Sequence, residues 1–233
     1  MGILFSFAVL LVVVFIVLEL KRRWLYAIFA KGIASFGFLL VALFAIADRM
    51  IGGITMITRL DIQISILFVA GLIAGLLGDI TLALRPLRPE HENRTIIFSG
   101  IVCFSIGHLF YLAALLRYAD FQILAIPFAV GITGLVFLMS KLMKFAMGRL
   151  TIPTFVYSFL IFLMIGQAVF MPPAGASTTF VSIVVAGAVL FGISDLILAP
   201  IYFKGEKSPL FIGANLATYY AAQLLLAISL LFL

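Results

Sequence analysis

Charged side chains are scarce in this chain. They make up only 10% of its 233 residues, whereas 65% of the residues are hydrophobic and the mean hydropathy is +1.33. A soluble domain is roughly half apolar and about a quarter charged. The composition therefore excludes an ordinary soluble domain and indicates a protein embedded in a lipid bilayer.

Cysteine and histidine are also rare. Cys103 is the only cysteine, so no intramolecular disulfide can form. One of the two histidines, His91, lies in a polar loop, which excludes a zinc site built on several histidines. The sequence has no His-Glu-x-x-His motif, no Gly-x-Ser-x-Gly motif and no glycine-rich phosphate loop. We therefore expect neither a metal nor a cofactor.

Long hydrophobic runs dominate what is present. Crossing a bilayer takes about 20 apolar residues, and eight segments meet this requirement. They are Ile3–Leu20, Tyr26–Ala47, Ile62–Leu84, Ile96–Leu116, Phe121–Ser140, Ile152–Phe170, Phe180–Tyr202 and Leu210–Leu233. The runs are continuously apolar rather than alternating, which excludes a β-barrel. The polar breaks are too short for a soluble domain, so we predict an all-α fold in which residues 1–233 form one eight-helix transmembrane domain.

The basic residues predict the orientation of these helices. One set of alternate loops holds eleven of them: Lys21, Arg22, Arg23, Arg85, Arg88, Arg94, Lys141, Lys144, Arg149, Lys204 and Lys207. The opposite set holds only Arg49, Arg59 and Arg117. Because cytoplasmic loops carry the excess of basic residues, we place the four basic loops in the cytoplasm and both termini on the other side. The net charge of +6 thus belongs to helix ends and does not indicate nucleic-acid binding.

The first apolar segment is expected to be a retained helix. A signal peptide begins with basic residues, whereas here the basic residues 21–23 follow the segment. The protein is therefore predicted to reside, as a multi-pass protein, in the cell membrane. That would be the inner membrane of a bacterium or the endoplasmic reticulum of a eukaryote.

Two similar segments suggest an internal duplication. The third apolar run ends with the residues 78–84, GDITLAL, and the seventh ends with 194–200, SDLILAP. Their aspartates are separated by about half of the chain, and both helices run toward the cytoplasm. This is the spacing of a parallel 4+4 repeat. The alternative is a chance match between two short segments.

Four ionisable residues lie inside the apolar runs: Lys31, Asp79, His108 and Asp195. A charge in hydrocarbon costs several kcal/mol unless it is paired or faces a cavity. Helical rise places the four residues about 9 to 20 Å from the basic loops. Any single one of them could have a purely structural role, either protonated or paired with a neighbour. Clustered ionisable residues, however, can pair with one another and so offset the cost of burial. We therefore predict a shared polar cavity in the cytoplasmic half of the bundle.

Further polar side chains fall at comparable depth. They are Tyr111, Tyr157, Asn215, Tyr219 and Gln223, and we expect them to bind substrate. The segment 71–75, GLIAG, is typical of a small-residue face at which two membrane helices pack closely.

The combination of residues favours acid–base chemistry. A carboxyl group in a dry pocket is stabilised in its protonated form, whereas one beside a lysine is stabilised as the anion. Two carboxyl groups in such different environments form an acid and a base. Such a pair suits hydrolysis by protonation and addition of water, without a protein nucleophile.

These residues resemble the lysoplasmalogenase family of membrane proteins, also called YhhN-like, over nearly the whole chain. The motifs that carry the resemblance are Lys31, Leu77-Gly78-Asp79, Gly107-His108-Leu109-Phe110-Tyr111, Val156-Tyr157, Ser194-Asp195-Leu196-Ile197-Leu198-Ala199 and Ala217-Thr218-Tyr219-Tyr220-Ala221-Ala222-Gln223. One departure is Gly32, because family members often have a proline directly after the lysine.

The resemblance implies a membrane hydrolase that cleaves the vinyl ether bond of lysoplasmalogens. The products would be a fatty aldehyde and glycerophospho-ethanolamine or -choline. We expect Asp79, Asp195, Lys31 and His108 to be catalytic, with one aspartate as the general acid and the other orienting water. The expected partners are a lysophospholipid, whose phosphate faces Arg85 or Arg88, and the bilayer itself.

Two other classes of function also fit the intramembrane charges. A proton-coupled transporter of a small lipidic solute would use Asp, His and Lys as a relay, and a repeat is common in transporters. A lipid-binding or sensing bundle would bind without forming a product. Polar residues gathered at one depth favour a closed site, and hence an enzyme, over a path through the membrane.

Overall fold

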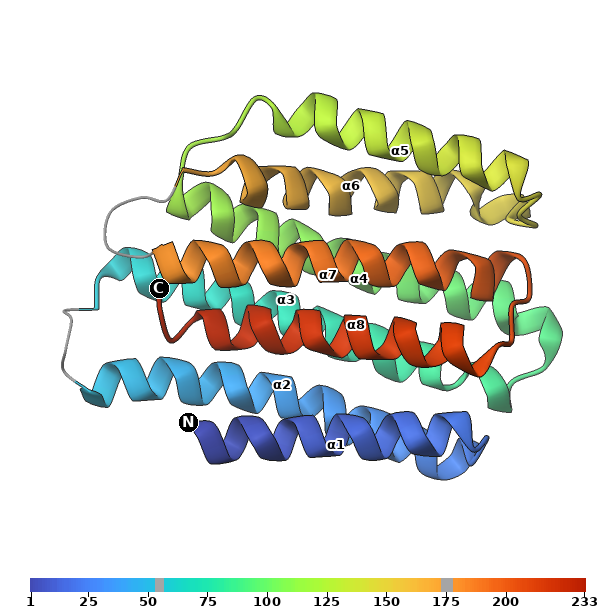
Figure 1. Ribbon diagram of the computed structural model, residues 1–233, viewed down its shortest axis with the longest axis horizontal. Helices are drawn as coiled ribbons and strands as arrows, with labels where there is room; N and C mark the ends of the chain where they lie inside the picture. The colour runs from blue at the N-terminus through green and yellow to red at the C-terminus, as the bar shows by residue number, and fades with distance from the viewer. Residues whose placement is uncertain (53–56, 173–177) are drawn as a thin grey trace.

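The computed structural model describes residues 1–52, 57–172 and 178–233 (Figure 1). Within these ranges the chain is helical and contains no strand. The eight long helices are α1 (Gly2–Leu20), α2 (Trp24–Gly52), α3 (Arg59–Ala83), α4 (Asn93–Tyr118), α5 (Ala125–Leu142), α6 (Thr151–Phe170), α7 (Thr178–Phe203) and α8 (Pro209–Ser229). Single 3₁₀ turns occupy Arg85–Leu87, Glu90–Glu92 and Gly148–Leu150. All eight helices are long and apolar enough to cross a membrane, so the predicted eight-helix fold is confirmed.

The helices run side by side as one bundle, with α1 at one edge and α5 at the other (Figure 1). Consecutive helices pack as the pairs α1–α2, α3–α4, α5–α6 and α7–α8. Contacts of α4 with α6 and of α2 with α8 join these pairs. The core between them is rich in fully buried aromatic residues such as Phe38, Phe68 and Phe191.

The connections α1–α2, α3–α4, α5–α6 and α7–α8 all lie at one end of the bundle, and both termini lie at the other (Figure 1). These four connections and their adjoining helix ends contain the eleven basic residues, so this end is called the basic end below. That it faces the cytoplasm stays a prediction.

The helices α3 and α4 approach each other closely, as the small-residue segment predicted. A Cβ atom added at Gly71 would lie 2.4 Å from the ring of Tyr111. One added at Gly107 would lie 3.2 Å from the carbonyl oxygen of Gly71. These glycines therefore let two backbones and a tyrosine ring occupy space that any side chain would fill.

The helix α5 begins at Ala125, four residues later than predicted from the apolar run. The cause is Gln167 of α6, which is fully buried. Its Oε1 accepts a hydrogen bond from the backbone N–H of Gln122 at 2.8 Å, and its Nε2 donates to the carbonyl of Asp120 at 3.0 Å. These bonds hold the α4–α5 connection in a non-helical conformation.

Candidate functional site

A cavity of about 500 Å³ lies at the basic end of the bundle. Its walls come from α1, α2, α3, α4, α7 and α8 and from the connections at that end. Lys31, Asp79 and Asp195 all line it. Three of the four ionisable residues predicted to share a cavity thus line it, from three separate helices. The fourth, His108, was predicted to join them but does not line the cavity and is buried in the core.

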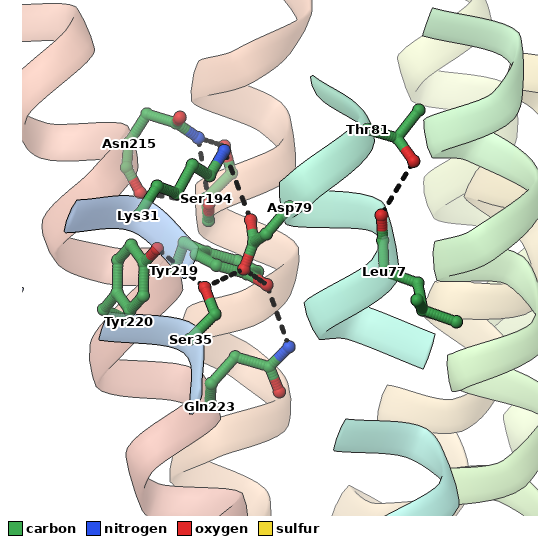
Figure 2. Close-up of polar contacts among 10 residues, drawn as sticks. All are labelled: Lys31, Ser35, Leu77, Asp79, Thr81, Ser194, Asn215, Tyr219, Tyr220 and Gln223. Atoms are coloured by element: carbon green, nitrogen blue, oxygen red, sulfur yellow. Dashed lines mark hydrogen bonds and ion pairs between the residues drawn. The ribbon is translucent and has the colours of Figure 1, made fainter. Parts of the chain in front are cut away.

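Asp79 of α3 is held by three donors (Figure 2). The Lys31 Nζ lies 3.3 Å from its Oδ1. The hydroxyl groups of Ser35 and Tyr219 each donate to its Oδ2 at 2.7 Å. An ionised carboxylate accepts hydrogen bonds and cannot donate them, so this environment suits the anion. Only 2% of Asp79 is exposed, and its burial makes these partners essential.

The hydrogen bonds continue from Asp79 into the core (Figure 2). The Tyr219 hydroxyl accepts from Gln223 Nε2 at 3.1 Å, and Gln223 Oε1 accepts from the Tyr111 hydroxyl at 2.9 Å. On the other side, the hydroxyl groups of Ser35 and Tyr220 are 2.9 Å apart. This chain of bonds, called the Asp79 network below, fixes the carboxylate from α2, α4 and α8.

Asp195 of α7 has a different environment. The Tyr157 hydroxyl of α6 donates a hydrogen bond to its Oδ2. His108 Nε2 lies 3.4 Å from the same hydroxyl, and the His108 ring is buried edge-on against Phe191 with centroids 4.6 Å apart. No lysine or arginine of the described residues forms an ion pair with Asp195. The two aspartates therefore face one cavity but differ in their charge environment.

Asp195 is anchored through its neighbour Ser194. Asn215 of α8 donates from Nδ2 to the carbonyl and to the hydroxyl of Ser194, at 2.8 and 2.9 Å (Figure 2). The Ser194 hydroxyl in turn donates to the Asn215 carbonyl at 3.2 Å. Three bonds across the α7–α8 contact thus fix the backbone beside the carboxyl group.

The mouth of the cavity carries charges of both signs. Arg22, Arg85, Arg88 and Lys207 line it together with Glu19, Glu90 and Glu206. The Arg85 guanidinium lies 4.7 Å from the ring centre of Tyr202. Arg88 pairs with Glu92 at 3.6 Å. Such a rim suits a zwitterionic or phosphate-bearing group.

A second, smaller pocket of about 90 Å³ lies on the other side of Asp195. Its lining comes chiefly from α4, α6 and α7. Tyr157 and Asp195 line it, and apart from Thr154, Ser158 and Tyr202 its other lining residues are apolar. We call it the side pocket.

The predicted site residues thus fall into two groups. Asn215, Tyr219, Lys31 and both aspartates line the main cavity, and Tyr157 lines the side pocket. His108, Tyr111 and Gln223 line neither cavity and lie behind it, within hydrogen-bonded chains. Sequence reasoning missed Ser35, Tyr220 and Ser194. Ser35 lies one turn after Lys31, so helical spacing could have indicated it. Tyr220 and Ser194 directly adjoin predicted site residues, and helical spacing gives no signal for them because adjacent residues on a helix do not share a face.

No group of three or more His, Cys, Asp or Glu side chains within the described ranges is arranged to hold a metal ion.

The comparisons with known proteins give one result. Residues 33–230 match the YhhN family. This span contains every predicted site residue except Lys31, which lies two residues before it. No curated protein and no solved structure matches the chain significantly.

Proposed function

The chain belongs to the YhhN family, and on this premise we propose that it is a lysoplasmalogenase-type membrane hydrolase. In this proposal it cleaves the vinyl ether bond of a lysoplasmalogen, releasing a fatty aldehyde and the glycerophospho-ethanolamine or -choline. The family suggests this class of reaction. The observation that supports it most is the pair of differently held carboxyl groups on one cavity.

Asp195 is the proposed general acid. It has no cationic partner among the described residues, and apolar side chains such as Phe191, Leu198 and Phe104 line the cavity around it. A carboxyl group in such surroundings is stabilised in its protonated form. Its proton goes to the alkenyl carbon remote from oxygen, and the adjacent carbon and the ether oxygen then share the positive charge.

Asp79 is the proposed anion of the pair. Its carboxylate, held by Lys31, Ser35 and Tyr219, stabilises the oxocarbenium ion and orients the attacking water. Water adds to the cationic carbon and gives a proton back to Asp195, which leaves a hemiacetal. The hemiacetal separates into the aldehyde and the free glycerol hydroxyl. The overall change is the addition of one water molecule. Protonation of this kind contributes roughly 10²–10⁴-fold to a rate.

Tyr157 and His108 are proposed positioning residues. Tyr157 donates to Asp195 Oδ2 and so directs the other carboxyl oxygen, and its proton, toward the substrate. His108 contacts the Tyr157 hydroxyl from within the core and does not line the cavity. It therefore acts on Asp195 only through the tyrosine.

The experiment is aldehyde detection from the purified protein in detergent micelles. The substrates are vinyl-ether, alkyl-ether and ester lysolipids with the same head group and chain length. The proposal predicts aldehyde from the vinyl ether alone. Absence of aldehyde, together with uptake of the lipid into sealed proteoliposomes, would overturn it in favour of a transporter.

A further inference from the structure

The side pocket has the shape and polarity of a site for hydrocarbon. Ile97 and Ile101 of α4, Ile161 and Phe162 of α6 and Ala199 of α7 line it. Cavities lined mainly by apolar side chains bind apolar molecules; one of roughly 150 Å³ binds benzene. At about 90 Å³, the side pocket has room for a short stretch of an alkyl chain.

The side pocket adjoins the main cavity through a shared wall. Asp195, Phe104 and Tyr202 line both, as do Leu82 and Leu198. The carboxyl group proposed to protonate the substrate therefore lies where the two hollows meet. A molecule bound across this boundary would have its polar part at the basic end and its apolar part between α4, α6 and α7.

The ends of the side pocket differ. Toward the basic end, the lining residues Ile97 and Phe203 belong to a cluster of buried apolar residues with Met147 and Leu150. Toward the bilayer, Leu196 of α7 lines the pocket and is 48% exposed on the surface of the bundle. The part of the lining that Leu196 contributes therefore lies at the surface of the bundle.

We propose that the side pocket binds the part of the substrate hydrocarbon chain next to the vinyl ether, and that the rest of the chain passes Leu196 into the bilayer. This inference rests on the proposed function. In this proposal the pocket binds a single alkenyl chain, and the first carbons of that chain lie beside Asp195. The competing location is the apolar wall of the main cavity formed by Phe15, Ile28 and Ile212.

Two hydroxyl groups allow the role of the side pocket to be tested by substitution. Thr154 and Ser158, one turn apart on α6, both line the pocket, and their side-chain oxygens have no hydrogen-bond partner among the residues that the structure describes. Replacing a buried hydroxyl that lacks a partner by an apolar group removes an unfavourable burial. Ser158→Leu and Thr154→Leu should therefore fill the pocket while the protein stays folded. Thr133→Leu is the matched control, because Thr133 also has a buried oxygen without a partner in the described part of the chain but lines neither cavity.

The first test does not depend on turnover. An alkyl-ether lysolipid with a diazirine on the fourth chain carbon is photolysed in the wild-type protein, and the labelled peptides are mapped by mass spectrometry. Label on the pocket-lining parts of α4, α6 and α7 supports the proposal. Label on α1, the first half of α2 or α8 overturns it, whether or not the protein produces aldehyde. Label in the pocket without any aldehyde formation would instead overturn the proposed function alone.

The second test uses selectivity. Substrates with a sixteen-carbon chain and with a three-carbon alkenyl chain are compared. The pocket-filling variants Ser158→Leu and Thr154→Leu should lower kcat/KM for the long chain at least tenfold more than for the short one. Thr133→Leu should leave this ratio at the wild-type value. Equal ratios in all four proteins, with folding verified by thermal unfolding, would overturn the proposal.

Discussion

The Lys31 ammonium of α2 lies 3.3 Å from the Asp79 carboxylate of α3, with only 12% and 2% of the two side chains exposed. Ser35 and Tyr219 complete the coordination of the same carboxylate. Because Asp195 has no such cation within the described residues, the pair distinguishes two carboxyl groups that would otherwise be alike. The proposed division into acid and anion depends on this difference.

Removal of Lys31 should destabilise the protein strongly. Lys31→Met leaves the buried Asp79 without its counter-charge, and such losses cost ~3–5 kcal/mol. The double variant Lys31→Met/Asp79→Asn removes both charges and should unfold at a higher temperature than the single variant. Thermal unfolding in detergent measures both. If the single variant proved as stable as the wild type, the ion pair would have no structural role.

Loss of the Tyr157 hydroxyl should reduce turnover without loss of the fold. Tyr157→Phe removes the bond that positions Asp195 and should lower kcat by about tenfold, which is part of the roughly 10²–10⁴-fold that general acid catalysis contributes. If His108 acts through this hydroxyl, His108→Phe should lower kcat in the wild type but have little further effect in the Tyr157→Phe background. A double-mutant cycle on kcat provides the test. Additive effects would contradict the positioning role of His108.

The α3–α4 contact should not tolerate a methyl group at Gly71. Gly71→Ala places a Cβ atom 2.4 Å from the Tyr111 ring, and overpacking of this kind costs ~1–3 kcal/mol. The matched control is Gly131→Ala on α5, where the added Cβ would meet no atom of the described residues within 4 Å. That control should be neutral or slightly stabilising, since alanine favours helix by up to ~1 kcal/mol over glycine. Equal unfolding temperatures for the two variants would contradict the close packing.

The basic rim should recognise the phosphate of the head group. Arg85→Gln removes a guanidinium from the mouth of the cavity, and we expect KM to rise for a lysoplasmalogen with kcat little changed. For an alkenylglycerol, which lacks phosphate, KM should stay at the wild-type value. An equal rise for both substrates would place the role of Arg85 in the structure of the mouth rather than in phosphate binding.

The eight helices and the shared cavity could be predicted from sequence because hydrocarbon permits few alternatives. Depth along a helix was predictable as well, since each residue adds a fixed rise. The direction in which a side chain points around the helix axis could not be predicted. His108 and Gln223 lie at the depth of the site yet behind its wall, because neighbouring helices determine which face lines the cavity.

Part of the Asp79 network could not be predicted from a single sequence. Ser35 and Tyr220 are ordinary residues for a membrane helix, and their contact joins residues 185 positions apart. The start of α5 was predicted wrongly for a similar reason. Apolarity marked residues 121–124 as membrane-spanning, whereas the amide of Gln167, distant in sequence, binds the backbone there.

The central claim is that Asp195 and Asp79 act together on a vinyl ether bound in one cavity. The most direct measurement is aldehyde release from a vinyl-ether lysolipid by the wild type, Asp195→Asn, Asp79→Asn and the control Asp120→Asn. Asp120 is exposed and lies outside both cavities. The account predicts aldehyde from the wild type and Asp120→Asn, and a loss of at least a hundredfold in each folded site variant. Wild-type rates in a folded Asp195→Asn or Asp79→Asn protein would contradict it.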